Sequence, residues 1–179
     1  MKSLKDLLFG RTWLGSVGRI VALLIFCSIP FGYHYQTIWV DGISMEPTYD
    51  NGQWTLMQRK RSLGNDWSPD RFDVIIVWSD ELKINLCKRV IGLPGEEVKV
   101  FEGKIYIDER ELSDTFGKGK MIYMQLQDPD TDEIWWKEYE NIPATVIKSN
   151  EVWVIGDNRQ DSLFGHFPIK RIHGKIVLY

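Results

Sequence analysis

The sequence predicts a mainly β protein, with an antiparallel β-sheet or barrel domain behind one N-terminal transmembrane helix. From Trp54 onward the chain is a series of short β-like runs divided by turn residues. Helical patterns of ten or more residues do not alternate with these runs, which argues against βαβ units. Ahead of the runs, residues 20–40 carry no formally charged side chain. These observations predict an anchored β domain.

The uncharged segment 20–40 matches the roughly 20 residues that cross a hydrocarbon core. The residues ahead of it include Lys2, Lys5, Arg11 and Arg19, and those just after it include Asp41, Glu46 and Asp50. The positive-inside rule then places the N-terminus in the cytoplasm. We therefore expect a cytoplasmic segment 1–19, an anchor at 20–40 and an extracytoplasmic domain at 41–179, with a hairpin excursion at about 100–150.

Two other interpretations of the N-terminal segment stay open. One is a secretory signal that is cleaved, but bulky residues follow the apolar stretch where a small-x-small cleavage site would be needed. The other is a core or peripheral helix, since Pro30, Gly32, His34 and Gln36 weaken the second half of the segment. An uncleaved anchor is favoured over both.

Within the β domain, several tight bends can be placed. The stretch 97–112 predicts two successive hairpins, with Glu102-Gly103 and Asp108-Glu109 at the bends. Residues 121–140 predict another hairpin with a polar tip at 127–132. Its Trp135 and Trp136 are either core residues or residues that dip into a membrane interface. Residues 59–71 are expected to be a loop between two strands.

Composition excludes several classes of function. A net charge of −3 and a pI of about 5.7 give no positive field for nucleic acid. Cys27 and Cys87 are too far apart in the chain to suggest a disulfide framework or a thiolate site. The three histidines lack ligand spacing. We expect no metal, no cofactor, no nucleic-acid partner and a monomeric chain.

Lys88 breaks the pattern of its strand. With a period of two residues, Ile84, Leu86, Lys88 and Val90 share one face, so a lysine interrupts an apolar row. In an apolar environment the pKa of a lysine falls, and the amine can act as a base near neutrality. The alternative is that Lys88 extends along its aliphatic stem to water.

Ser44 is the candidate partner for such a base. It precedes a turn at Met45-Glu46-Pro47, with Gly42 close by to allow a tight approach of the backbone. A serine is a weak nucleophile that a neighbouring base can activate. Taken alone, however, Ser44 is equally consistent with an ordinary turn or cap serine.

Together these stretches resemble the type I signal peptidases, membrane-anchored serine proteases with a Ser/Lys dyad. Four blocks match in order: GISMEPT at 42–48, RFDVIIVW at 71–78, KRVIGLPGEEV at 88–98 and GDNRQDS at 156–162. The resemblance implies that the enzyme removes signal peptides from exported preproteins after small residues. It also implies a bacterial cytoplasmic membrane location, with membrane lipid as a second partner.

The resemblance assigns roles to individual residues. Ser44 matches the nucleophile and Lys88 the general base, while Ser162 matches a serine whose hydroxyl orients that lysine. Asp157, between Gly156 and Asn158, belongs to a turn that braces the site. Gly42 stands where many members carry a serine that helps to bind the oxyanion, so the hole is expected to depend largely on backbone N–H groups, with that of Ser44 as the candidate.

One departure concerns the last block. After Ser162 about four residues of the family pattern are missing, including an Asp and an Arg that usually support this region. Asp161 or Arg159 is expected to compensate.

The substrate is expected to bind extended along a strand edge, with Ile43 and Met45 as the nearest candidates for its pockets. Two alternatives to a general signal peptidase stay open: a specialised conjugation-type maturation peptidase, and an anchored β domain that binds exported peptides without cutting them. Self-cleaving SOS repressors share Ser/Lys chemistry, but they carry a DNA-binding region and no anchor.

Overall fold

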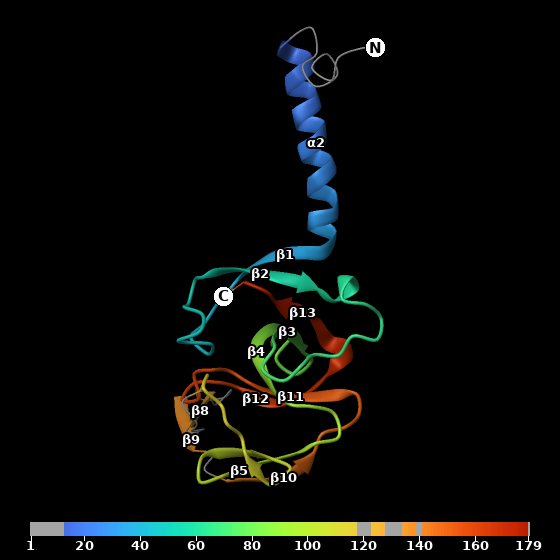
Figure 1. Cartoon of the computed structure of the whole chain (residues 1–179). Helices are drawn as coiled ribbons and strands as arrows, with labels where there is room; N and C mark the ends of the chain where they lie inside the picture. The colour runs from blue at the N-terminus through green and yellow to red at the C-terminus, as the bar shows by residue number, and fades with distance from the viewer. Residues whose placement is uncertain (1–12, 118–122, 128–133, 139–140, 179) are drawn as a thin grey trace.

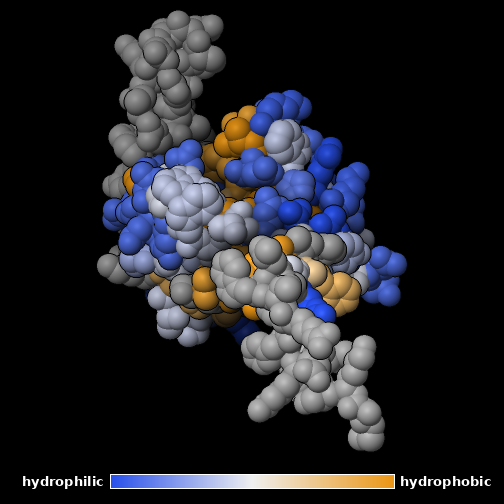
Figure 2. All heavy atoms as spheres, turned by 90° about the horizontal axis from the view of Figure 1, so that it is seen from above, coloured by the Kyte–Doolittle hydropathy of each residue, from blue (hydrophilic) through white to orange (hydrophobic). Residues whose placement is uncertain are grey.

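The computed structural model describes residues 13–117, 123–127, 134–138 and 141–178. One long helix, α2 (Trp13–His34), stands above a body made of β-strands (Figure 1). Hydrophilic side chains cover most of the coloured surface in the view from above (Figure 2). The predicted mainly β, antiparallel architecture is confirmed, since all strand pairs of the described residues are antiparallel.

The larger sheet has seven strands in the order β1-β2-β13-β3-β4-β11-β12. Their bounds are β1 Tyr35–Trp39, β2 Trp54–Arg59, β3 Val74–Ser79, β4 Ile84–Gly92, β11 Glu151–Ile155, β12 Phe164–Pro168 and β13 Ile172–Ile176. Two short 3-10 helices, η1 (Lys60–Ser62) and η2 (Ile169–Arg171), lie next to strands of this sheet. Strands β3, β4 and β11 are mostly buried, as their β-branched and aliphatic residues predict.

A four-stranded sheet follows the order β10-β5-β6-β7 and lies at the end of the body away from α2 (Figure 1). Its strands are β5 Glu97–Phe101, β6 Lys104–Ile107, β7 Arg110–Glu111 and β10 Ile142–Val146. Both predicted bends are confirmed: Glu102, Asp108 and Glu109 have positive φ angles there, as tight hairpins require.

Strands β8 (Tyr123–Gln127) and β9 (Ile134–Glu138) form the predicted third hairpin. Its tip lies outside the described residues, as do the side chains of Trp135 and Trp136. The alternatives of core residues and interface residues for these two tryptophans stay predictions.

The predicted anchor 20–40 needs a correction. The helix begins at Trp13 and ends at His34, and residues 35–39 form strand β1, which pairs with β2 from Tyr35↔Gln58 to Trp39↔Trp54. Aromatic and β-branched residues in this stretch favour a strand. Strand β2 supplies backbone hydrogen-bond partners, so residues 35–39 pair with it although the apolar segment could have continued as a helix. Over the part of the chain that the structure describes, no helix combines the length and apolarity that crossing a bilayer requires.

Candidate active site

Lys88 lies in the middle of β4, opposite Ile75 of β3, with only 3% of its surface exposed. Leu86 and Val90, on the same face of the strand, are buried as well. The alternative of a lysine that reaches to water is therefore wrong. Burial is the main cause that lowers the pKa of Lys88, from 10.5 to about 8, because a charged amine loses its hydration there.

Ser44 lies in the loop between β1 and β2, and this loop is held at both ends. Met45 and Tyr49 are buried in a core cluster with Val40 and Met57, and this packing fixes the position of the segment after the serine. Gly42 has a φ of 94°, a conformation that glycine adopts without strain, and its N–H donates to Asn51 Oδ1 at 2.9 Å. The peptide bond between Glu46 and Pro47 is cis. The loop thus fixes the backbone around the hydroxyl.

The two predicted catalytic side chains meet. Nζ of Lys88 lies 2.6 Å from Oγ of Ser44, although the residues are 44 positions apart in the chain. A neutral amine at this distance can accept the hydroxyl proton directly, which is the geometry that general-base activation of a nucleophile needs.

The turn at 156–162 holds the backbone on both sides of Ser44. The backbone N–H of Asn158 donates to the carbonyl of Ser44 at 3.1 Å, and its side-chain Nδ2 donates to the carbonyl of Ile43 at 3.2 Å. A Cβ atom at Gly156 would lie 2.0 Å from the Ser44 carbonyl oxygen, so only glycine permits this approach. These contacts fit the bracing role that the sequence predicts for the turn.

Ser162 does not make the contact that the resemblance implies. Its hydroxyl donates to the carbonyl of Leu163 at 2.9 Å and accepts a hydrogen bond from the N–H of Gly156 at 2.6 Å. Among the described residues it has no hydrogen bond with Lys88. A hydroxyl has one proton to donate, and the Ser162 hydroxyl donates it to the Leu163 carbonyl. Together with the hydrogen bond from Gly156, this contact makes Ser162 a residue that stabilises the turn.

Asp157 forms a buried ion pair with Arg89, the neighbour of the lysine on β4. Arg89 Nε lies 2.7 Å from Oδ1 and Nη2 lies 2.6 Å from Oδ2, a bidentate arrangement with both side chains almost fully buried. Thr48 Oγ1 donates to Oδ2 of the same carboxylate at 2.5 Å. The guanidinium also lies 3.6 Å from the ring centre of Phe116. Asp157 thereby connects β4 to the loop that carries Ser44.

Arg159 supports the turn from the side of its side chain. Its Nε donates to the carbonyl of Gly156 at 2.9 Å, and its Nη2 forms an ion pair with the carboxylate of Asp114. Both side chains of this pair are buried. A Cβ at Gly117 would collide with the guanidinium. Of the two candidates named from the sequence, Arg159 makes these contacts, with an acidic partner from the segment after β7.

The roles of Arg89 and Asp114 were not predicted from the sequence. Arg89 alternates with Lys88 along β4, so its place on the opposite face of the strand was available from the period of two residues. Its carboxylate partner is 68 positions away, and no local pattern points to it.

Cys87 is a second reactive residue type beside the dyad. Burial raises the pKa of its thiol to about 12, so it stays protonated near neutral pH and does not compete as a nucleophile. Within the described residues, no three His, Cys, Asp or Glu side chains are grouped closely enough to hold a metal ion.

A cavity of about 420 Å³ has chain neighbours of the dyad in its lining, Cys87 just before Lys88 and Asp41 three residues before Ser44, although neither dyad residue lines it. Its lining comes from β1 and the residues after it, from β2, β3 and β4: Gln36, Thr37, Ile38, Trp39, Val40, Asp41, Trp54, Ile76, Asn85 and Cys87. The predicted pocket residues are not among them. Met45 is 1% exposed because it packs into the core, and Ile43 has 43% of its surface exposed.

Comparison with known proteins identifies the family of this chain. A family model described as signal peptidase, peptidase S26, matches residues 12–179. Signal peptidase I V of Bacillus subtilis (strain 168) is 28% identical over 172 residues, which cover 93% of this chain and 96% of the relative. Signal peptidase I of Bacillus caldolyticus is 30% identical over 145 residues, covering 76% and 74%.

A crystal structure of a signal peptidase I from Enterococcus faecalis V583 aligns with a TM-score of 0.42 and 24% identity, over 62% of this chain and 98% of that one. The family match covers nearly the whole chain and agrees with the resemblance of the four sequence blocks. The chain therefore belongs to the signal peptidase family, peptidase S26, and is a serine endopeptidase of the signal peptidase I type.

Proposed function

We propose that this enzyme removes N-terminal signal peptides from exported preproteins, with Ser44 as the nucleophile and Lys88 as the general base. The observation that carries the proposal is the 2.6 Å separation of the Lys88 amine and the Ser44 hydroxyl, at a lysine whose pKa is lowered by burial. A specialised maturation peptidase would use the same dyad, and it differs only in the number of precursors that it accepts.

The reaction follows from the positions of these two groups. The Lys88 amine takes the hydroxyl proton while Ser44 Oγ attacks the scissile carbonyl carbon. The ammonium then gives that proton to the departing amine of the mature protein, and the signal peptide stays bound to Oγ as an ester. Lys88 next takes a proton from water, the resulting hydroxide attacks the ester, and the signal peptide leaves with a carboxylate end while Ser44 regains its proton.

The negative charge on the tetrahedral oxygen needs donors close to Ser44. The backbone N–H of Ser44 makes no hydrogen bond within the described residues, so it is available for this purpose. Gly42 offers no hydroxyl as a second donor, and its own N–H is already given to Asn51. We therefore propose that the backbone N–H of Ser44 is the main hydrogen-bond donor of the oxyanion hole.

The precursor is proposed to bind as an extended strand between β1 and the first half of β4. Strand β1 is an edge strand that pairs only with β2, and β11 pairs with β4 only from Arg89 onward. In the described part of the chain, residues 84–88 of β4 therefore have no strand partner on one side. The cavity next to the dyad is lined by residues of both strands. Backbone hydrogen bonds to the two strands would fix the main chain of the precursor, and the cavity would take its small side chains.

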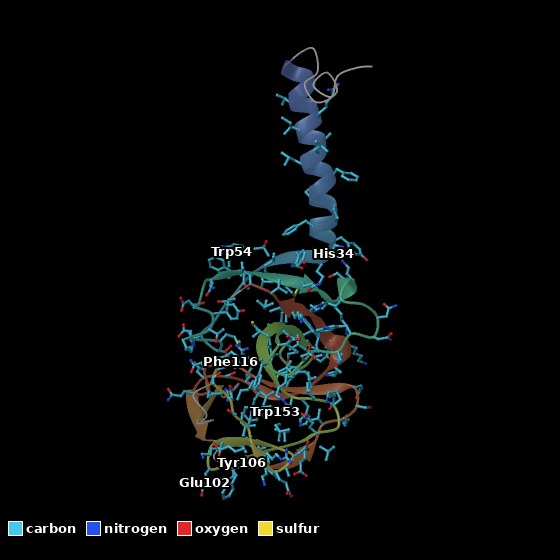
Figure 3. The ribbon with its side chains drawn as sticks, viewed as in Figure 1. His34, Trp54, Glu102, Tyr106, Phe116 and Trp153 are labelled. Carbon is cyan, nitrogen blue, oxygen red and sulfur yellow. The ribbon has the colours of Figure 1, made fainter. Side chains whose placement is uncertain are left out.

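The proposed place of action is the outer surface of the bacterial cytoplasmic membrane. Large apolar side chains are exposed along α2, among them Leu23 at 61%, Leu24 at 65% and Phe26 at 73%. Figure 3 shows side chains extending from this helix with no other element beside it. Contact with lipid would remove this apolar surface from water, and it supports a membrane-bound enzyme that meets its substrates where they emerge.

Cleavage of a preprotein tests the proposal. The purified enzyme in detergent should release a mature protein whose N-terminus follows a small residue, as N-terminal sequencing would establish. A matched preprotein with a bulky residue in place of that small one should be cut much more slowly. Binding of both precursors without any cleavage would support a peptide-binding domain instead and contradict the proposal.

The rate of cleavage should rise with pH through about 8 and level off above it. Below its pKa of about 8 the Lys88 amine carries a proton and cannot accept another, and above that pH it is neutral. An amine with the ordinary pKa of 10.5 would be neutral in fewer than about 1% of molecules at pH 8. The measurement is kcat/KM from pH 6 to 10, and a flat profile over that range would contradict a lysine base.

A further inference from the structure

The cavity next to the dyad continues into a second cavity of about 330 Å³. The two share four lining residues, Gln36, Ile38, Ile76 and Asn85, so they form one groove along β1. Asn85 is three residues from Lys88 on β4, a distance of about 10 Å at the rise of a β-strand. An extended peptide that reaches the dyad can therefore pass through the second cavity as well.

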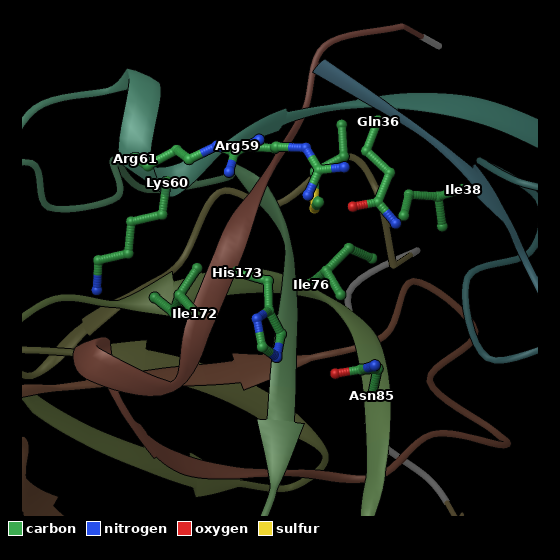
Figure 4. A pocket seen from close by; sticks show the side chains of 10 residues that line it. Gln36, Ile38, Arg59, Lys60, Arg61, Ile76, Asn85, Ile172 and His173 are labelled. Carbon is green, nitrogen blue, oxygen red and sulfur yellow. The ribbon is translucent and has the colours of Figure 1, made fainter. Parts of the chain in front are cut away.

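The lining of the second cavity is basic. Arg59, Lys60, Arg61 and His173 contribute to it, and none of its ten lining residues is acidic (Figure 4). Among the described residues, the ion pairs of this protein involve other basic side chains, and none of Arg59, Lys60 and Arg61 has a carboxylate within 4.0 Å. Within the described part of the chain, no carboxylate therefore compensates the positive charge of these three side chains.

Backbone carbonyls hold the three cations in place. Lys60 Nζ donates to the carbonyl of Ile169 at 2.6 Å, and Arg61 Nε donates to that of Tyr33 at 3.0 Å. Arg59 Nε donates to the carbonyl of Tyr35 at 3.3 Å, while its two terminal nitrogens have no hydrogen-bond partner among the described residues. Two such parallel donors match the two oxygens of a carboxylate. Figure 4 shows the Gln36 side chain on the same side of the cavity as Arg59.

The position of α2 indicates which part of a substrate reaches this cavity. Helix α2 ends at His34, and β1 begins with Tyr35 at the same end as Gln36 and Arg59. If the exposed apolar side chains of α2 mark the lipid side, the apolar segment of a precursor enters from there. That segment lies upstream of the bond that is cut, so upstream residues pass the second cavity on their way to Ser44.

We infer that the second cavity is a subsite for an acidic side chain of the precursor, about four to six residues before the cleaved bond, with Arg59 as its main contact. The inference rests on the proposed function, because it needs a precursor in the groove. An anionic lipid headgroup is the other chemistry that could meet these cations. Continuity with the groove at the dyad favours the peptide, since four residues line both cavities.

The test uses a set of preproteins that differ only by Gln or Glu at each of the positions four, five and six residues before the cut. For wild type, one of the Glu substrates should have a kcat/KM about three- to tenfold above its Gln counterpart, mainly through a lower KM. In Arg59→Gln this ratio should fall to about one, and in Arg59→Lys most of it should remain. The control is Arg110→Gln, an exposed arginine of β7 on the other sheet, which should keep the wild-type ratio.

The outcomes separate this inference from the proposed function. If wild type cuts the Gln and Glu substrates equally well at all three positions, the subsite is wrong while the peptidase assignment stands. If wild type cuts none of them, the proposed function itself fails. If Arg59→Gln keeps the Glu preference and instead loses the stimulation of cleavage by vesicles with anionic lipid, the cavity binds headgroups and the inference is overturned.

Discussion

Replacement of Lys88 by methionine should lower kcat/KM for a preprotein by at least about 10⁴-fold, and Ser44→Ala should do the same. Methionine keeps most of the volume of lysine but has no group that can take the proton of the Ser44 hydroxyl, which lies 2.6 Å from the Lys88 amine. Because the two side chains act as one unit, the double variant should be no less active than either single variant.

A loss of structure would mimic this result, so the folded state needs its own measurement. Burial of the Lys88 amine costs hydration energy in the folded protein. Because Lys88→Met removes this cost, the variant should unfold at the same or a higher temperature than wild type. The matched control is Lys148→Met, a lysine whose side chain is 76% exposed, which should retain full activity. Substantial cleavage by either dyad variant would refute the assigned roles.

Replacement of Asp157 by asparagine should lower the free energy of unfolding by about 3–5 kcal/mol. The change leaves the Arg89 guanidinium buried without its carboxylate, and the loss of one partner of a buried ion pair is far more costly than the loss of an exposed pair. The Thr48 hydroxyl would also lose a charged acceptor. Equilibrium unfolding in urea would measure the change.

Asp80→Asn is the matched control for Asp157. Asp80 pairs with Arg171 at 2.8 Å, but both side chains are about half exposed, so this substitution should cost less than about 1 kcal/mol. Equal losses for the two variants would mean that the buried pair between β4 and the 156–162 turn has no special part in the stability of the site.

Much of this architecture could be predicted because it depends on local patterns. Alternating apolar residues and turn chemistry predict the antiparallel strands and the bends at Glu102 and Asp108, and the structure confirms them. Lys88 was identified as an exception within an apolar row, and the burial of its amine follows from the same period of two residues. These features are determined by neighbours along the chain.

The incorrect or missing predictions depend on partners far away in the chain. Residues 35–39 are apolar enough to extend a helix, but pairing with β2 makes them a strand. Ser162 was expected to meet Lys88, whereas its hydroxyl is used at Leu163 and Gly156. The partner of Arg159 is Asp114, from a segment with no recognisable motif. Such contacts are properties of the folded topology.

The central claim is that the Lys88 amine is neutral at the pH where the enzyme works, and titration of that amine is its most direct test. NMR spectra of the protein with ¹³C-labelled lysine, assigned by comparison with Lys88→Met, should show one lysine that titrates with a pKa of about 8. A Lys88 signal that titrates near 10.5, the ordinary value of a lysine, would contradict the account.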